Sequence, residues 1–154
     1  MTIRRAKSAD IPAVLDLLDE VNMIHHVARP DIFKCATKYS AADLEKIFAD
    51  DGTPVFVYDD GEKVLGYAFC EIKSKSRDTL FQDMKMLFID DFCVDEAARG
   101  KGVGTALLDH VEAYAKEIGC TSISLNVWSF NDAARAFYEK HGMRPQRTIM
   151  EKKI

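Results

Sequence analysis

The sequence lacks the features of several protein classes. It has only four cysteines and four histidines, with no CxxC pair and no spaced Cys/His set, so neither a metal site nor a disulfide framework is indicated. The net charge of −4 offers no basic excess for binding nucleic acid. No apolar run is long enough to cross a bilayer, and the N-terminus lacks the apolar core of a signal peptide. We therefore expect a cytoplasmic protein with buried, reduced thiols that binds neither nucleic acid nor membranes.

The apolar periodicity predicts a single domain over residues 1–154. Alternating apolar residues mark the expected strands, and apolar residues at steps of three and four mark the expected helices. Their order is βααβββαβαβ, which describes an α+β (α/β layered) fold with one sheet and about four helices. The expected strands cover 2–6, 54–58, 63–73, 87–94, 123–127 and 143–154, the last of which could form one or two strands. The expected helices begin at Ser8 or Asp10, at Ser40, at Val103, and at Asn131 or Asp132. The segments 22–39 and 74–83 are expected to be irregular.

A glycine-rich turn between an apolar strand and an amphipathic helix is the most informative stretch. It reads Arg99-Gly100-Lys101-Gly102-Val103-Gly104, and the helix after it ends at Gly119, where a left-handed cap is expected. The first N–H groups of a helix have no intrahelical partner, and glycines lack the Cβ atoms that would keep an anion away from them. Arg99 and Lys101 add positive charge. The turn therefore favours a bound phosphate group.

The spacing within the turn narrows the type of site. A Walker loop needs GxxxxGK[ST] and a dinucleotide-binding turn needs GxGxxG, and the turn fits neither. It does fit R/Q-x-x-G-x-G/A, with Arg99, Gly102 and Gly104 at the defined positions. In this respect the chain resembles the GCN5-related N-acetyltransferase (GNAT) superfamily, whose loop of this form binds the pyrophosphate of acetyl-coenzyme A (acetyl-CoA). A tight strand-to-helix connection without a ligand is the alternative.

A second motif strengthens this resemblance. Asn131, Ala134, Phe137 and Tyr138 form an N-x-x-A-x-x-F-Y pattern that leads into Gly142, similar to the second GNAT signature. The resemblance implies a splayed mixed sheet, in which two adjacent parallel strands part and hold the pantetheine arm of acetyl-CoA at their carboxyl ends. The residues expected to contact the cofactor are Phe92, Cys93, Val94, Arg99, Gly100, Lys101, Gly102, Val103, Gly104, Asn131, Ala134 and Phe137.

Two aspartates on the strand before the turn are candidates for the general base. An alkylammonium group has a pKa of about 10.4, so acetyl transfer to an amine needs a group that removes a proton. A regular strand would present only one of Asp90 and Asp91 to the cleft, but the resemblance implies a bulge here. The Ile89-Asp90-Asp91-Phe92 run is similar to the Leu-Glu-Asp-Phe run of the spermidine/spermine acetyltransferase branch, which implies that Asp90 acts as base, through a water. Alternatively, the aspartates only solvate a strand end.

The resemblance also implies a general acid and two further contacts. Tyr138 would protonate the departing coenzyme A sulfur, although it shares a helix face with Phe137 and His141 and could be a core aromatic instead. The backbone N–H of Val94 would stabilise the oxyanion. Asn131 would contact the cofactor, cap its helix, or do both.

Other residues near the expected site have ordinary structural explanations. Cys93 is a buried thiol, since direct attack by an amine needs no acyl-cysteine. His25 and His26 lie on the side where GNAT proteins often bind the acceptor, but a solvated helix end explains them equally well. We therefore assign no catalytic role to these three residues.

The function that the resemblance implies is acetyl-CoA-dependent N-acetylation of a primary amine, by direct attack in a ternary complex. GNAT proteins are often homodimers, and the adjacent carboxylates favour a small cationic, polyamine-like acceptor. A peptide or protein N-terminal amine and an antibiotic amine are the alternative acceptors. A non-catalytic acyl-CoA-binding regulatory domain and a ligand-free interaction module are alternatives of another class.

Overall fold

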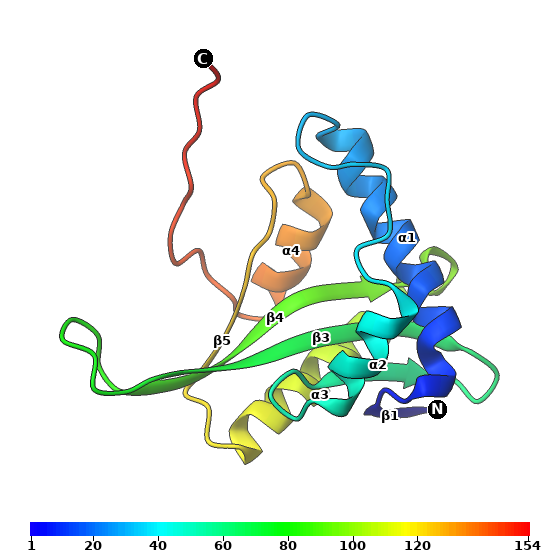
Figure 1. Ribbon diagram of the computed structural model, residues 1–154, viewed down its shortest axis with the longest axis horizontal. Coiled ribbons are helices and arrows are strands. Elements are labelled where there is room, and N and C mark those ends of the chain that lie inside the picture. Colours follow the sequence, from blue (N-terminus) through cyan, green and yellow to red (C-terminus); the bar gives the residue numbers. More distant parts are fainter.

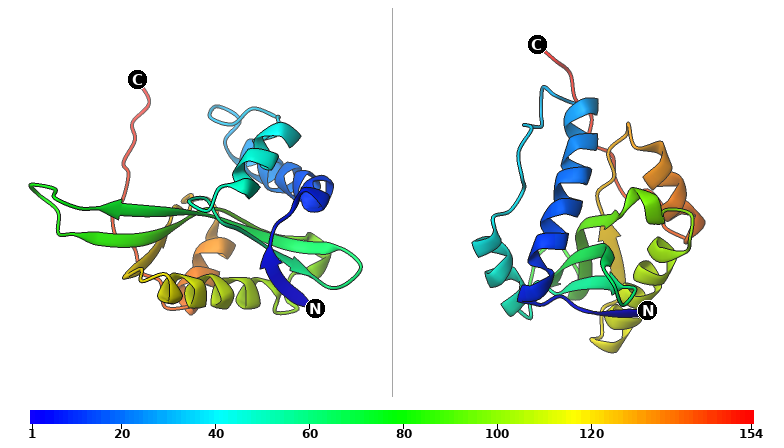
Figure 2. Two further views of the ribbon diagram at one scale, coloured as in Figure 1. Left: turned by 60° about the horizontal axis from the view of Figure 1, so that its bottom comes forward. Right: turned by 90° about the vertical axis from the view of Figure 1, so that its right-hand side faces the viewer.

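The structure, a computed structural model, describes all residues 1–154 as a five-stranded sheet with helices on both faces (Figures 1 and 2). The strands are β1 (Thr2–Arg5), β2 (Val55–Asp59), β3 (Val64–Lys75), β4 (Met84–Val94) and β5 (Ser122–Leu125), and the helices are α1 (Ile11–Ala28), α2 (Ala41–Ala49), α3 (Val103–Glu117) and α4 (Asp132–Lys140). Helices α1 and α2 cover one face of the sheet, and α3 and α4 lie on the other (Figure 2). The predicted α+β layered fold is confirmed.

The sheet is antiparallel except at one end. Its strands follow the order β1-β2-β3-β4-β5, and only the β4–β5 pair is parallel. That pair is short, because it joins Met86–Ile89 to Ser122–Leu125, whereas β4 continues for five more residues to Val94. The two parallel strands therefore part beyond Ile89, which is the splay expected from the sequence.

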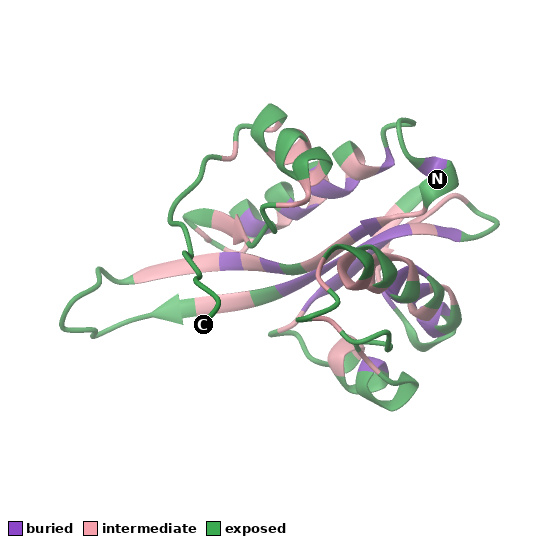
Figure 3. Ribbon diagram, turned by 90° about the horizontal axis from the view of Figure 1, so that it is seen from above, coloured by how far each residue is buried: buried purple, intermediate pink, exposed green.

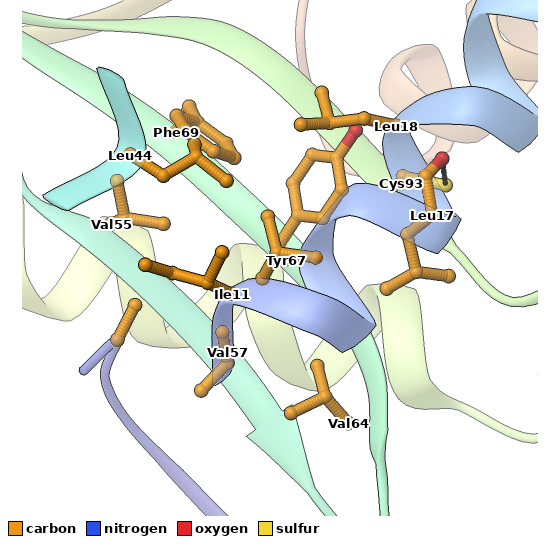
Figure 4. Packing of buried hydrophobic residues seen from close by; sticks show 12 residues of the cluster. Ile11, Leu17, Leu18, Leu44, Val55, Val57, Val64, Tyr67, Phe69 and Cys93 are labelled. Atoms are coloured by element: carbon orange, nitrogen blue, oxygen red, sulfur yellow. Dashed lines mark hydrogen bonds between the residues drawn. The ribbon is translucent and has the colours of Figure 1, made fainter. Parts of the chain in front are cut away.

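The sheet separates two hydrophobic cores. On the α1 and α2 face, Leu18, Leu44 and Tyr67 are fully buried (Figure 4). On the α3 face, Leu107 and Leu87 are fully buried between helix and sheet. Each helix thus fixes its own side of the sheet, and the splayed end of β4 is held by packing on both faces.

Several local predictions are confirmed. Ser40 caps α2, since its Oγ accepts a hydrogen bond from the Asp43 N–H at 3.2 Å. Gly61 closes the β2–β3 hairpin with a φ of +102°, and Gly119 follows α3 with a φ of +78°. Both angles lie in the left-handed region that favours glycine.

None of the four helices combines the length and the apolar composition that crossing a lipid bilayer requires.

Helix α1 is longer than predicted. It continues to Ala28, so His25 and His26 lie in its last turn, and the irregular segment begins at Arg29. After Pro12 in the first turn, the chain has no glycine or proline before Pro30. The residue before a proline disfavours helical backbone, which explains why the helix ends where it does.

The predicted final strand is wrong. Residues 144–154, which we call the tail, have no regular structure and are exposed throughout (Figure 3). Alternation predicts an extended backbone but not a partner for it, and the tail has no neighbouring strand in this chain. The expected burial of the thiols is confirmed for Cys70 and Cys93, partial for Cys120, and wrong for Cys35, which is exposed on the irregular segment after α1.

One buried ion pair near the N-terminus makes stability depend on pH. Asp10 is only 5% exposed, and Arg4 donates to its two oxygens at 2.7 and 2.9 Å. The hydrogen bonds from Arg4 lower the pKa of Asp10 and outweigh the effect of burial, which raises it. Because the folded pKa lies below the unfolded value of about 3.9, the pair stabilises the fold at neutral pH and ceases to do so as pH falls through the folded pKa.

Asp10→Asn is therefore expected to lower the free energy of unfolding by about 2 kcal/mol at pH 7, because Arg4 loses one of its two carboxylate partners and keeps only Asp59, at 2.8 Å. The loss should shrink at about pH 3, where the wild-type carboxyl also begins to protonate. Urea denaturation of both proteins at both pH values measures this difference. An equal loss at the two pH values would show that the Asp10 charge does not stabilise the fold.

Candidate active site

The parted strands are lined by aromatic side chains. The ring of Phe92, on the splayed end of β4, lies 6.0 Å from the ring of Phe137 and 6.1 Å from that of Tyr138, both on α4. Beyond Ile89 the β4 backbone has no strand partner on this side, so its peptide groups face the gap. This arrangement can hold an extended chain along β4.

The glycine-rich turn leads directly into α3. Gly100 and Gly102 have φ values of +74° and +83°, and Gly102 is the N-cap of the helix, so no side chain caps it. The first intrahelical hydrogen bond runs from the Ala106 N–H to the Gly102 carbonyl, which leaves the preceding N–H groups unpaired. A Cβ on Gly102 would meet no atom within 4 Å, so the space over the turn is open. The turn can therefore accept an anion such as a pyrophosphate.

Gly104 serves a different purpose. A Cβ at this position would lie 3.3 Å from Cζ of Phe137 and 3.6 Å from a methyl carbon of Val94. The missing side chain lets α3 approach α4 and β4 closely. His141 adds a second link between the helices, with its Nε2 3.2 Å from the Thr105 hydroxyl.

The two cations of the turn differ in their surroundings. Arg99 pairs with Glu20 of α1 at 2.5 Å and donates from Nε to the Val94 carbonyl at 3.1 Å. It therefore ties the turn to α1 and to the splayed strand. Lys101 is exposed and forms no ion pair within the chain, so its charge is available to a ligand.

A bulge in β4 brings both aspartates to one cation. Asp91 pairs with Phe69 of β3 and Ile89 pairs with Cys70, so Asp90 is the extra residue between them. The Nζ of Lys38 lies 2.9 Å from Asp90 Oδ2 and 3.2 Å from Asp91 Oδ2. The bulge implied by the resemblance is present, and as a result neither carboxylate points away from the other.

Two tyrosines complete the polar cluster around these carboxylates. The Tyr39 hydroxyl donates to Asp90 at 3.1 Å, and the fully buried Tyr67 donates to Asp91 at 3.2 Å. Burial lowers the pKa of Lys38, but the two carboxylates outweigh it and raise the pKa overall, so the ammonium stays charged. The cluster of Lys38, Asp90 and Asp91 therefore carries a net charge of about −1 at neutral pH.

An aromatic cluster joins the last turn of α1 to the segment between β5 and α4. His25 stacks on Phe33 at 5.0 Å, and Trp128 lies 5.1 Å from Phe33 and 5.9 Å from Phe130. Burial lowers the pKa of His25 and outweighs the opposing effect of the Asp91 charge. The sequence did not predict the contacts of Phe33 with His25 and Trp128, or the ion pairs of Lys38, because the segment 29–40 carries no periodic pattern.

Tyr138 and Cys93 are both kept in their protonated forms. Burial raises the pKa of Tyr138, and the nearby Asp91 charge raises it further, so the phenol remains a hydrogen-bond donor. Burial also raises the pKa of Cys93 to about 12, and its thiol donates to the Leu17 carbonyl at 3.6 Å (Figure 4). A neutral buried thiol is a poor nucleophile, which favours a structural role for Cys93.

Asn131 caps α4, which is one of the two roles predicted for it; the other is contact with the cofactor. Its Oδ1 accepts a hydrogen bond from the Ala134 N–H at 3.1 Å. The amide nitrogen forms no hydrogen bond within the chain and can serve a ligand. The partly buried Ala134 lies on the same first turn of α4.

Comparison with known proteins identifies the family. The model of the acetyltransferase (GNAT) family matches residues 21–143, which is most of the chain and includes both motifs. The chain belongs to the GNAT family. The fold described above, with its parted parallel strands and its glycine-rich turn before α3, is thus that of a GNAT acetyltransferase.

Individual proteins that are similar to this GNAT chain support the family assignment. A crystal structure of a tetramutant of the BH1408 protein from Bacillus halodurans superposes with a TM-score of 0.96 at 30% identity, covering 100% of both chains. The uncharacterized N-acetyltransferase YycN of Bacillus subtilis is 36% identical over 67 residues, 44% of this chain and 43% of YycN. Blasticidin-S acetyltransferase of Streptomyces morookaense is 39% identical over 64 residues, 41% of this chain and 46% of that enzyme. The matches span less than half the length of these two curated relatives.

Proposed function

We propose that this GNAT protein transfers an acetyl group from acetyl-CoA to the primary amine of a small cationic acceptor, by direct attack in a ternary complex. The observation that supports this proposal best is the position of the acidic pair. Asp90 and Asp91 lie on the same strand end that parts from β5, and the ring of Phe92, the next residue, lies 6.1 Å from that of Tyr138.

The donor half of the site fits acetyl-CoA. The unpaired N–H groups at the start of α3 and the Lys101 ammonium would bind the pyrophosphate. The splayed part of β4, with Phe92, Cys93 and Val94, would hold the pantetheine arm, and Ala134 and Phe137 would flank it from α4. Asn131 would contribute its free amide nitrogen. The bound cofactor would supply an acetyl thioester beside Tyr138.

The position of the Lys38 side chain indicates where the amine acceptor would bind. Its ammonium already occupies the position between Asp90 and Asp91 that a substrate ammonium would take. Lys38 belongs to the irregular segment 29–40, so it can swing aside more readily than a residue of a helix or strand. Because Lys38 holds its own ammonium between the two carboxylates, a substrate ammonium must displace it to bind there. The aromatic cluster beside it would bind the apolar or planar part of the acceptor.

Each step of transfer has a residue to perform it. Asp90, which is 40% exposed, would accept the ammonium proton through a water, leaving the nitrogen lone pair free to attack the thioester carbonyl. The Val94 N–H would stabilise the oxyanion as the new C–N bond forms. The C–S bond would then break as Tyr138 gives its hydroxyl proton to the departing thiolate. The second proton of the nitrogen would pass to the Tyr138 phenolate, so that the amide and the coenzyme A thiol both leave neutral. Because burial raises the pKa of the Tyr138 phenol, it is still protonated, and able to donate, when the thiolate forms.

The charge balance of the acceptor site can be tested in both directions. The double variant Asp90→Asn/Asp91→Asn is expected to raise KM for cationic amines by about tenfold or more, equivalent to about 1.4 kcal/mol, and to change KM for neutral amines much less. Lys38→Met should lower KM for cationic amines by a similar factor, since it removes the competing ammonium. Steady-state kinetics with amines of matched size and different charge measure both effects.

Lys34→Met is the matched control for Lys38→Met. Lys34 lies on the same irregular segment but is exposed and forms no ion pair. We expect it to leave KM unchanged. The proposed ammonium site would be contradicted if the two lysine variants changed KM equally. It would also be contradicted if the double aspartate variant raised KM equally for charged and for neutral amines.

The acceptor class itself can be determined by release of the coenzyme A thiol across polyamines, aminoglycosides, amino acids and short peptides. We expect small cationic amines to accelerate release. Acceleration by peptides alone would replace the proposed acceptor with a peptide N-terminus. Acetyl-CoA binding that no amine converts into turnover would favour a regulatory acyl-CoA-binding domain.

A further inference from the structure

Tyr67 carries a hydroxyl group into the apolar core. Its side chain, on β3, is fully buried among the apolar residues of the α1 and α2 face, and its ring lies 5.0 Å from that of Phe69 (Figure 4). Placing a hydroxyl in an apolar core costs free energy unless the group is hydrogen-bonded. Burial raises the pKa of this phenol, so it stays protonated and donates to Asp91 Oδ1 at 3.2 Å, its hydrogen-bond partner within the chain. The hydroxyl therefore acts on that carboxylate.

The register of the sheet determines this contact. Tyr67 pairs with Cys93 and Phe69 pairs with Asp91, so Tyr67 and Asp91 are diagonal neighbours on one face of β3 and β4. Asp90, the extra residue of the bulge, has no partner in this register. Strands β3 and β4 both have a neighbouring strand on either side. The hydrogen bond between Tyr67 and Asp91 thus joins two interior strands of the sheet.

The two carboxylates of the proposed ammonium site differ in their hydrogen bonds. Asp91 is 11% exposed, and both its oxygens have partners, the Tyr67 hydroxyl at Oδ1 and the Lys38 ammonium at Oδ2. Asp90 is 40% exposed, and Lys38 and Tyr39 both donate to its Oδ2, so its Oδ1 has no partner in the chain. Lys38 and Tyr39 belong to the irregular segment after α1, whereas Tyr67 belongs to a strand. If that segment moves, Asp91 keeps a partner and Asp90 keeps none.

We propose that Tyr67 is a positioning residue that holds Asp91 as the fixed carboxylate of the acceptor site. By occupying Oδ1, the hydroxyl turns Oδ2 toward the point where the substrate ammonium would bind, which the Lys38 Nζ occupies in the structure at 3.2 Å. It also keeps this nearly buried carboxylate hydrogen-bonded once Lys38 is displaced. Asp90 then has a free oxygen with which to accept the proton. This role rests on the proposed function, because it concerns the acceptor site of that reaction.

The Tyr67 hydroxyl matters more for a free amine than for Lys38. Lys38 is tethered to the chain, so the effective concentration of its ammonium at the carboxylates is high, and it can follow a carboxylate that has rotated. A free amine has no tether, and it also has to place its nitrogen beside the thioester. Without the hydroxyl, Asp91 can rotate about its side-chain bonds, and the site then favours Lys38 over the substrate.

Tyr67→Phe tests the proposal, because it removes the hydroxyl and keeps the ring. We expect KM for a primary alkylamine to rise about tenfold, and KM for an alkoxyamine of the same length, which is uncharged at neutral pH, to change by less than about twofold. Tyr58→Phe is the matched control, because the Tyr58 hydroxyl lies on β2 and contacts the Met1 sulfur at 2.9 Å. It should leave both KM values unchanged. Equal rises for the two amines, or no rise for the alkylamine, would overturn the proposal.

The single aspartate variants test the same division of roles in chains that keep Tyr67. Asp91→Asn is expected to raise KM for the alkylamine more than Asp90→Asn does, because Asp91 is the fixed partner of the ammonium. Asp90→Asn should instead lower kcat more, because it removes the group that accepts the proton. Steady-state kinetics measure both. The reverse order of the two KM effects would contradict the fixed position of Asp91.

Equilibrium binding separates this role of Tyr67 from the proposed function. Calorimetry with the same alkylamine, in the presence of coenzyme A, which has no acetyl group to give, measures the ammonium site without turnover. We expect binding to the wild-type chain and about tenfold weaker binding to Tyr67→Phe. If the wild-type chain shows this difference but acetylates no amine, the proposed function fails and the role of Tyr67 stands. If it acetylates the amine but both chains bind the amine equally, or neither binds it, the role of Tyr67 fails and the function stands.

Discussion

Gly102→Ala is expected to weaken acetyl-CoA binding by at least about 100-fold. The Ala side chain would occupy the space directly over the start of α3, where the pyrophosphate would accept hydrogen bonds from backbone N–H groups. Hydrogen bonds to a charged group contribute about 1.5–3 kcal/mol each, so losing two of them accounts for an effect of this size. Calorimetric titration with acetyl-CoA measures it.

Gly119→Ala is the matched control for this variant. Gly119 has a φ of +78°, close to the +83° of Gly102, and a Cβ there also meets no atom within 4 Å. The two variants should therefore carry a similar backbone strain of about 1–2 kcal/mol at opposite ends of α3. Only Gly102→Ala should lose binding. Equal loss in both would mean that strain, and not access to the turn, determines affinity.

Tyr138→Phe is expected to lower kcat by roughly 10² to 10⁴, the usual contribution of a general acid, without a change in acetyl-CoA affinity. The hydroxyl forms no hydrogen bond within the chain, so its removal should not disturb α4 or the melting temperature. Pre-steady-state and steady-state kinetics with one amine acceptor measure the effect, and calorimetry measures affinity.

The opposite pattern for Tyr138→Phe would be equally informative. An unchanged kcat would mean that the ring only packs against Phe92 and Phe137, and that water protonates the leaving thiolate. Weaker acetyl-CoA binding with an unchanged kcat would place the hydroxyl in cofactor binding instead.

The sequence predicted the parts of the site that local chemistry determines. The turn from Arg99 to Gly104 fits one known spacing and neither the Walker nor the dinucleotide pattern, and the left-handed φ values of Gly100 and Gly102 agree with the expected use of glycine. The helix cap at Asn131 is likewise a local feature. Such features depend on a few consecutive residues, so one sequence is enough to identify them.

Features that depend on distant segments could not be predicted in the same way. Whether Asp90 and Asp91 share a side depends on the register of β4 against β3, and the ion pair with Lys38 joins residues 52 and 53 positions apart. Phe33 meets Trp128 only because α1 and the β5–α4 connection meet at the same end of the sheet. The tail was predicted as a strand because its residues suit one, but a strand also requires a partner.

The central claim is that this GNAT chain moves an acetyl group from acetyl-CoA to an amine. It is tested most directly by quantifying, in one reaction, the coenzyme A thiol released and the acceptor acetylated on nitrogen, with Tyr138→Phe in parallel. We expect equal amounts of the two products from the wild-type chain and a large loss of both in the variant. Thiol without acetylated amine would mean simple thioester hydrolysis, and would contradict the assignment of Asp90, Asp91 and Lys38 to an acceptor site.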